Sequence, residues 1–215
     1  MTSATTRSFR GIRKGTAITA EGQATVARIF EASREVLSRA NAGEFSMRNI
    51  ATRAGLRLAN VQYYFKTRED LVLALINDTG ERYQKAYDKL RAKTADDPGK
   101  RFRAIVRFNL EDSFNPETRA LFIQFWALLD NLDGHAGNLL GKLYAINIGQ
   151  LREALSAIFP NVATQELTTR ATLVAGLTEG LMVAAAPTSE AETQRLLDRA
   201  FKLAISVSGV SAVDD

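Results

Sequence analysis

The spacing of apolar residues constrains this chain of 215 residues more than any other feature of its sequence. Between Gly, Pro and Asn breakers, apolar residues recur three and four positions apart. This spacing is typical of amphipathic α-helices, whereas strands would show runs of Val, Ile or Thr alternating with polar residues, and the chain has no such run. We therefore expect an all-α fold of about nine helices.

The breakers also divide the chain into parts. They predict an arm, a small helical domain, a larger helical domain and a loose tail, at residues 1–18, 19–66, 67–208 and 209–215. The arm holds Arg7, Arg10 and Arg13 among Ser, Thr and Gly, and its apolar content is too low for packing. We expect it to be flexible and basic, and its arginines are candidates for a minor groove.

Charge is distributed unevenly between these parts. Residues 1–70 hold 12 Lys and Arg against 6 Asp and Glu, whereas the remaining residues hold 16 against 18. A basic small domain joined to a nearly neutral larger one is the pattern expected when only the first part meets a polyanion. An ordinary solvated basic surface is the alternative interpretation.

Several functional classes are disfavoured by what the chain lacks. It has no cysteine, a single histidine, His135, in a Gly-rich turn, and no Gly-rich phosphate loop. We therefore expect no metal site, no cofactor and no catalytic residue, which disfavours a small all-helical enzyme. No apolar run is long enough for a membrane span and the first residues do not form a secretory signal, so we expect a cytoplasmic protein.

The most informative segment runs from Ser46 to Phe65. Ser46 can cap one short helix, Gly55 can make a turn, and a second short helix can follow from about Leu58. Two such helices can cross steeply, so that the second enters the major groove of DNA. The spacing is that of a helix-turn-helix, with Val61 and Phe65 directed into the small domain.

Residues 26–76 resemble the DNA-binding domain of the TetR family of bacterial regulators. The motifs that carry the resemblance are Phe30-Glu-Ala-Ser-Arg-Glu-Val-Leu37, Ser46-Met-Arg-Asn-Ile-Ala51, Ala54-Gly-Leu56, Tyr63-Tyr-Phe65 and Lys66-Thr-Arg-Glu-Asp-Leu71. Arg57 departs from the Ser or Thr that is usual in the family at the start of the recognition helix, and it cannot cap that helix but can reach a phosphate.

The resemblance implies a sequence-specific regulator, expected to be a repressor, that binds a palindromic double-stranded DNA operator as a homodimer and is released by a small-molecule effector. A non-specific architectural DNA-binding protein is the alternative within the DNA-binding class. Phe125-Trp126-Ala127 and Glu179-Gly180-Leu181 are also similar to a subgroup that includes choline-responsive regulators.

Three sets of candidate residues follow. The DNA-binding set is Ser46, Arg48, Arg57, Leu58, Ala59, Asn60, Gln62, Tyr63, Tyr64, Lys66, Thr67 and Arg68. Polar residues within otherwise apolar helices, together with aromatic and apolar neighbours, predict an effector pocket at Asn109, Phe122, Phe125, Trp126, Leu129, Tyr144, Asn147 and Glu179. Each polar member could instead be a satisfied core residue, and Glu179 could pair with an arginine or bind a cationic group.

The third set is a dimer interface. A stripe of small residues on one helix and an apolar face on the next predict contacts at Thr172, Gly176, Gly180, Leu197, Ala200 and Ala204. We further expect the helix that begins near Thr67 to link the two domains and to transmit effector binding to the recognition helices.

Overall fold

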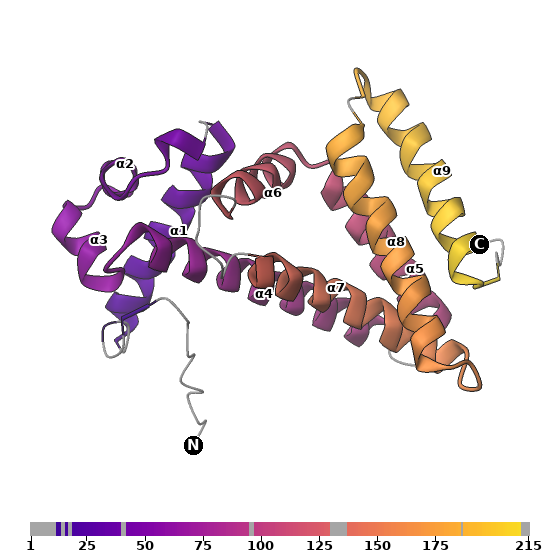
Figure 1. Cartoon of the computed structure of the whole chain (residues 1–215). Helices are drawn as coiled ribbons and strands as arrows, with labels where there is room; N and C mark the ends of the chain where they lie inside the picture. The colour runs from indigo at the N-terminus through magenta and orange to yellow at the C-terminus, as the bar shows by residue number, and fades with distance from the viewer. Residues whose placement is uncertain are drawn as a thin grey trace. The chain divides into compact units, whose positions relative to one another are not determined.

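The computed structural model describes residues 12–13, 16, 19–39, 42–94, 97–129, 137–185 and 187–211. Within these ranges the chain forms nine α-helices, one short 3-10 helix and no strand, which confirms the all-α prediction (Figure 1). The helices are α1 (Ala20–Arg39), η1 (Ala42–Glu44), α2 (Met47–Arg53), α3 (Leu58–Tyr64), α4 (Arg68–Lys93), α5 (Pro98–Ser113), α6 (Pro116–Leu129), α7 (Gly137–Ile158), α8 (Thr164–Ala184) and α9 (Glu190–Ser208).

Side chains cap the starts of three helices, including the cap at Ser46 that the sequence predicted. Thr19 accepts a hydrogen bond from the backbone N of Gly22 at 3.1 Å, and Ser46 accepts one from the backbone N of Asn49 at 3.2 Å. Thr67 and Asp70 form a reciprocal capping box at the start of α4. These bonds satisfy N–H groups that have no partner within the helix, and so fix where each helix begins.

The chain divides into two compact units. The first contains Met1–Glu81 and Ala120–Leu140, and the second contains Arg82–Arg119 and Gly141–Asp215. This division differs from the boundary after residue 66 that the sequence suggested, because the first half of α4 buries Leu71 and Leu75 completely. That half of α4 therefore belongs to the first unit, and the half from Arg82 onward belongs to the second.

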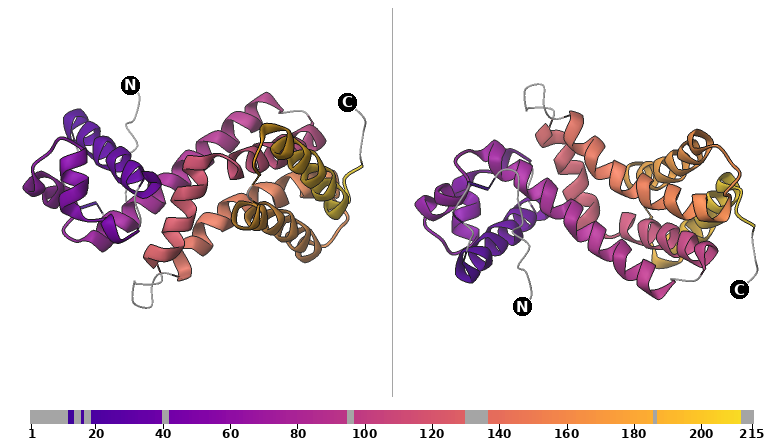
Figure 2. Two further views of the ribbon diagram at one scale, coloured as in Figure 1. Left: turned by 90° about the horizontal axis from the view of Figure 1, so that it is seen from above. Right: turned by 90° about the horizontal axis from the view of Figure 1, so that it is seen from below.

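In the second unit, α5, α8 and α9 contact one another, as the two views of Figure 2 also show. The core of this unit is apolar, and its fully buried residues include Phe102, Ile105, Leu110, Leu151, Leu155, Ala171 and Ala204. Arg170 closes the far end of α9 by donating to the carbonyl of Ser208 at 3.2 Å. No helix in the described ranges has the length and apolar character that crossing a membrane requires.

A tight turn joins α2 to α3. Gly55 adopts a φ of 63°, a left-handed conformation that costs a residue with a side chain about 1–2 kcal/mol. Arg28 of α1 donates to the carbonyl of Ala54 at 2.7 Å, which satisfies a carbonyl at the end of α2. The turn between α2 and α3 is thus stabilised by the conformation of Gly55 and by the hydrogen bond from Arg28.

We predict that Gly55→Ala lowers the free energy of unfolding by about 1 kcal/mol, because the added Cβ lies in ordinary contact with Arg28 and the cost is conformational. Gly141→Ala is the control, since a Cβ at that helical position meets nothing within 4 Å. The control should raise stability by about 0.5–1 kcal/mol. Urea denaturation of both variants checks this, and a change of the same sign in both would contradict it.

Candidate nucleic-acid interface

The recognition helix α3 has one buried and one exposed side. Val61 and Phe65 are fully buried, and the rings of Phe65 and Phe30 lie 5.8 Å apart between centroids. Burying a side chain of this size stabilises a domain by about 1.5–3 kcal/mol. The sequence prediction that both residues face the domain interior is confirmed, and this packing fixes the rotation of α3 about its own axis.

The other side of α3 presents polar and aromatic groups to solvent. Ala59, Asn60, Gln62 and Tyr63 are exposed, and Leu58 and Tyr64 are half-buried. The rings of Tyr63 and Tyr64 meet edge to face with centroids 5.1 Å apart. An exposed Asn or Gln amide can both donate to and accept from an adenine edge, so this face has the chemistry needed to read bases.

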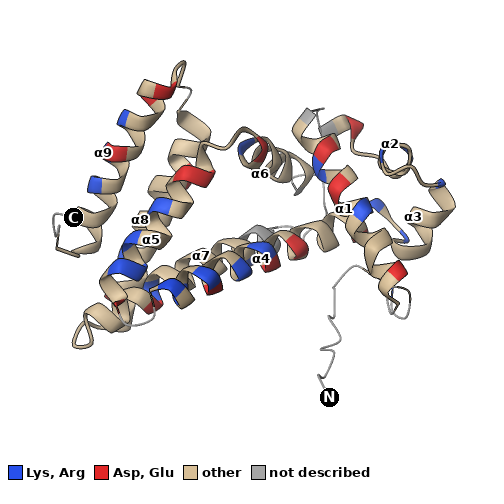
Figure 3. Cartoon of the chain, turned by 180° about the vertical axis from the view of Figure 1, so that it is seen from behind, with Lys and Arg blue, Asp and Glu red and all other residues tan. Residues whose placement is uncertain are grey.

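The starts of the two helices differ in how they are capped. Ser46 caps α2, whereas Arg57 stands at the N-cap of α3 with an extended backbone and forms no side-chain cap bond. The prediction that Arg57 cannot cap is confirmed. Because α2 and α3 contain no acidic residue, no side chain of these two helices neutralises the charge of Arg57 (Figure 3).

The arginines of the first unit fall into two groups. Arg28 and Arg53 bond to the carbonyl of Ala54 and to Glu35, and Arg34 bonds to Glu31 and Asp78, so all three are engaged within the protein. Arg13, Arg48 and Arg57, by contrast, are exposed, and no described residue bonds to their guanidinium groups. Lys66 is likewise exposed and unpaired within the described ranges.

Arg68 belongs to the engaged group, which the sequence did not anticipate. Its Nε donates to the carbonyl of Phe45 at 2.9 Å, and its guanidinium lies 5.8 Å from the centre of the Phe45 ring. The side chain therefore ties the start of α4 to the segment before α2. Phosphate contact by Arg68 stays a prediction for its two remaining nitrogens.

A hydrogen-bonded chain links three helices of the second unit. Tyr87 of α4 donates to Asn109 of α5 at 2.8 Å, and Asn109 donates to Asn147 of α7, also at 2.8 Å. Burial raises the pKa of the Tyr87 hydroxyl, which keeps it protonated as a donor. Both ends of the Asn109 amide are thus satisfied, which matches the alternative interpretation of Asn109 as a core polar residue.

Two carboxyl groups lie close to this chain. Asp112 accepts from Tyr83 and, at 3.0 Å, from the hydroxyl of Thr118. Burial raises the pKa of Glu179, the nearby Tyr144 hydroxyl lowers it, and the charge of Asp112 raises it. No arginine in the described ranges pairs with Glu179, so the ion pair considered from the sequence is not formed there.

Sequence reasoning missed Tyr83, Tyr87 and Asp112 as members of this cluster. The two tyrosines are four residues apart and so share one face of α4, and their rings pack around Phe108. This spacing was a usable signal. The hydrogen bond from Tyr83 to Asp112 could not be predicted from the sequence, because it depends on how α4 and α5 pack.

The residues of α6 predicted to line the effector pocket lie in the first unit. Phe122 and Phe125 are buried and meet edge to face, with centroids 6.1 Å apart. Trp126 is 54% exposed, so its assignment to the interior of an apolar pocket does not fit the structure. The side chain of Leu129 lies outside the described residues.

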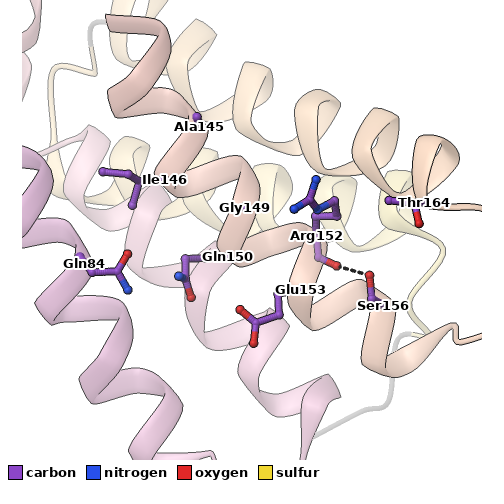
Figure 4. A pocket seen from close by; sticks show the side chains of 9 residues that line it. All are labelled: Gln84, Ala145, Ile146, Gly149, Gln150, Arg152, Glu153, Ser156 and Thr164. Atoms are coloured by element: carbon purple, nitrogen blue, oxygen red, sulfur yellow. Dashed lines mark hydrogen bonds between the residues drawn. The ribbon is translucent and has the colours of Figure 1, made fainter. Parts of the chain in front are cut away.

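A solvent-open groove of about 580 Å³ lies elsewhere in the second unit (Figure 4). Its lining residues are Gln84, Ala145, Ile146, Gly149, Gln150, Arg152, Glu153, Ser156 and Thr164. None of the predicted effector residues is among them, and Arg91 bonds to both Gln150 and Glu153 at this surface. The groove is more polar than the apolar pocket that the sequence predicted.

The predicted dimer residues differ in how exposed they are to solvent. Thr172, Gly176 and Gly180 are exposed, and a Cβ added at either glycine would meet open space. Ala200 and Ala204, however, are buried in the core of their own protomer, so they leave almost no surface for a second copy to contact. Leu197 is half-buried against the same core.

Some sequence predictions lie outside what the structure describes. Arg7, Arg10 and His135 lie outside the described residues. The flexible basic arm and the position of the histidine in a turn therefore stay predictions. Across the described part of the chain, no three His, Asp or Glu side chains are grouped so that they could hold a metal ion.

Comparison with known proteins points to one class. Residues 29–75, which include α2 and α3, match the family model described as bacterial regulatory proteins, tetR family. A protein of Yersinia pestis called HTH-type transcriptional regulator BetI is 29% identical over 168 residues, covering 75% of this chain and 81% of the relative. The BetI protein of Pseudomonas paraeruginosa is 28% identical over 185 residues, covering 80% and 87%.

Solved structures agree at the level of the fold. A TetR transcription regulator from Haloarcula marismortui superposes with a TM-score of 0.69 at 16% sequence identity, covering 87% of this chain and 97% of that one. The likeness extends well beyond the helix-turn-helix and includes most of the second unit.

We predict that Gln62→Ala and Lys66→Ala weaken DNA binding in different ways. Loss of the Gln62 amide should cost about 1–3 kcal/mol at particular base pairs and leave binding to random DNA unchanged. Loss of the Lys66 ammonium should weaken binding to all sequences and reduce the dependence of affinity on salt. Binding titrations on a specific site and on random DNA separate the two, and equal losses on both DNAs for Gln62→Ala would exclude base reading.

Proposed function

Because the chain belongs to the TetR family of DNA-binding transcriptional regulators, we propose that it acts as a homodimeric repressor that a small-molecule effector releases from a palindromic operator. The observation that carries the proposal is the exposed face of α3, flanked by the unpaired guanidinium groups of Arg48 and Arg57. Since operator binding requires access to DNA, the protein acts in the cytoplasm.

The need for a dimer follows from the size of α3. A helix of seven residues reaches only a few base pairs, so one copy cannot specify a site in a genome. A two-fold dimer doubles the length read and requires an inverted repeat.

An exposed apolar surface on α8 and α9 supports the dimer. Leu173 and Val183 of α8 are 57% and 63% exposed, and Leu203 and Val207 of α9 are 50% and 37% exposed. The small residues Thr172, Gly176, Gly180 and Ala184 lie exposed on α8 as well. We therefore assign Leu203 and Val207 to the interface in place of Ala200 and Ala204.

The polar cluster formed by Tyr83, Tyr87, Asp112 and Glu179 supports a site for the effector in the second unit. Glu179 is largely withdrawn from solvent, it lies close to the carboxyl group of Asp112, and no arginine of the described ranges compensates it. A ligand with a cationic group would stabilise the ionised form of Glu179, because an opposite charge offsets the cost of burying a carboxylate. The tyrosines of the cluster supply aromatic faces for such a group.

Coupling to DNA would run through α4. This helix contributes Tyr83 and Tyr87 to the cluster and Leu71 and Leu75 to the core of the DNA-binding unit. A ligand acts on operator affinity only if it binds the two dimer states with different affinity. A change in the packing of α4 is the step that would provide this difference.

Selection of bound sites from random DNA tests the function. We predict an inverted repeat, and we predict that Val183→Glu with Leu203→Glu weakens dimerisation by at least about 100-fold, because each lost apolar contact occurs twice in a two-fold dimer. The double variant should lose its preference for the full repeat over a single half-site. Ile123→Glu, an exposed apolar position on α6, is the control and should change neither property.

The outcomes separate the alternatives. Binding without sequence preference would identify an architectural DNA-binding protein instead. Selected sites with no two-fold symmetry, or a monomer at micromolar concentration, would reject the dimeric repressor.

For Glu179→Gln we predict a pH-dependent gain in stability. Because burial raises the pKa of Glu179 in the folded protein, ionisation favours the unfolded chain as pH rises above the ordinary value of 4.5. The variant cannot ionise, so its stability relative to the wild type should increase between pH 4.5 and neutrality and then level off. Urea denaturation across this range checks the prediction, and a constant difference between the two proteins would contradict it.

The same variant tests the effector site. Tetramethylammonium is the probe, since it is a cation that donates no hydrogen bonds. It should stabilise the wild type against urea more than it stabilises Glu179→Gln. Equal effects on both proteins would place the effector elsewhere.

A further inference from the structure

The solvent-open groove of the second unit lies on one side of α7, away from the buried polar residues of that helix. Its volume is about 580 Å³. Ala145, Gly149 and Arg152 line it and are four and three positions apart, so they share one side of the helix. Asn147, which accepts a hydrogen bond from Asn109, lies two positions before Gly149 and therefore about 200° around α7. The groove and the hydrogen-bonded chain through Asn109 and Asn147 are separate sites.

The groove keeps one positive charge that no carboxylate neutralises. The acidic residue of its described lining, Glu153, accepts from two nitrogens of Arg91, and this hydrogen bonding holds the pKa of Glu153 below its ordinary value. Glu153 is therefore ionised and paired. Arg152 is exposed, and its guanidinium group has no hydrogen-bond or ion-pair partner within the described residues. The charge of Arg152 is thus the one that remains for a ligand.

Further hydrogen-bond donors lie beside Arg152 in the lining (Figure 4). The side-chain oxygen of Gln150 accepts from Arg91 at 3.2 Å, which leaves the amide nitrogen of Gln150 able to donate. Thr164 is the first residue of α8, and its hydroxyl has no partner among the described residues. The N-cap residue Ala163 forms no side-chain cap bond, so the start of α8 adds partial positive charge at this edge. Both charge and donors therefore suit an anion.

The rest of the lining suits a carbon skeleton. Ala145 and Ile146 contribute apolar surface, and Gly149 contributes no side chain. A Cβ added at Gly149 would meet nothing within 4 Å, so the groove is open directly above the backbone of α7. Small-molecule sites have volumes of about 300–1,000 Å³, and this groove falls in that range. An inorganic ion would use only a small part of it.

We propose that this groove binds a small organic anion. Its carboxylate or phosphate oxygens accept hydrogen bonds from Arg152, Gln150 and Thr164, and its carbon skeleton packs on Ala145 and Gly149. The site differs from the proposed effector site at Glu179 in its position and in the sign of the charge that it prefers. It also stands apart from the proposed dimer interface, because none of the residues assigned to that interface lines it.

The chemistry favours an anion over a cation or a neutral molecule. A guanidinium group presents a planar set of donors that matches two oxygens of a carboxylate or phosphate. A cation would be repelled by Arg152 and would find the carboxylate of Glu153 already bonded to Arg91. A neutral molecule would form hydrogen bonds that lack charge assistance, which are about half as strong.

The test is a titration of the full-length protein followed by nuclear magnetic resonance. The signals observed are the Nε–H of Arg152 and the side-chain amide of Gln150. Benzoate and phenyl phosphate are the probes, and they share one ring but differ in the anionic group. Benzamide is the neutral counterpart of benzoate, inorganic phosphate lacks the ring, and sodium chloride at equal ionic strength measures screening alone.

Two variants remove different parts of the site. Arg152→Gln removes the charge, and Gly149→Leu fills the groove from a position whose side chain has open space. Arg195→Gln, an exposed arginine of α9, is the matched control for charge. Gly141→Leu is the matched control for bulk, because Gly141 is exposed on the same helix, does not line the groove and also has open space for a Cβ. Circular dichroism confirms that each variant is folded.

In the wild type, benzoate or phenyl phosphate should shift both signals to saturation and bind at least about 10-fold more tightly than benzamide and inorganic phosphate. The tighter of the two probes identifies the anionic group. Arg152→Gln and Gly149→Leu should each weaken this binding at least about 10-fold, with the Gln150 signal as the readout in Arg152→Gln. Both control variants should bind within about two-fold of the wild type.

Other outcomes overturn the inference. Shifts that sodium chloride reproduces, or that do not saturate with either anionic probe, would show that the groove holds no anion site. Equal affinity for benzoate and benzamide would exclude recognition by charge, and equal affinity for phenyl phosphate and inorganic phosphate would exclude an organic ligand. Wild-type affinity in Arg152→Gln or in Gly149→Leu would place the bound probe elsewhere. None of these measurements involves DNA, so the proposed function is tested separately.

Discussion

The burial of Val61 and Phe65 determines what α3 can present to DNA. A helix of seven residues has too few backbone hydrogen bonds to be stable alone, so its orientation depends on these two side chains and on their contact with Phe30 of α1. Once this side is buried, Asn60 and Gln62 must face outward. The turn at Gly55 and the bond from Arg28 to Ala54 then set the angle at which α2 supports the helix.

Electrostatics acts on the same scaffold by pairing some arginines and leaving others unpaired. Arg34 and Arg53 have carboxylate partners within the first unit, whereas Arg48, Arg57 and Arg13 have none in the described part of the chain. An unpaired surface cation adds little to the stability of a protein but attracts a polyanion through solution. The distribution of acidic residues is therefore as important for DNA binding as that of the basic ones.

The sequence predicted the features that depend on local chemistry. The cap at Ser46 and the two sides of α3 follow from residue type and spacing within a few positions. Features that depend on packing between distant helices were not accessible in this way. Ala200 lies on an apolar face of α9 whether that face meets its own protomer or a second one, and only the packing with α5 and α8 decides between them.

The separation between buried and exposed sides of α3 bears on how such regulators diverge. Asn60 and Gln62 contribute nothing to the core, and substitutions at exposed positions of this kind usually change stability by less than about 0.5 kcal/mol. Changes in the base sequence recognised therefore carry almost no folding penalty. The same scaffold can acquire a new operator by mutation of a few surface residues, and regulators that descend from a duplicated gene can separate their targets without first becoming more stable.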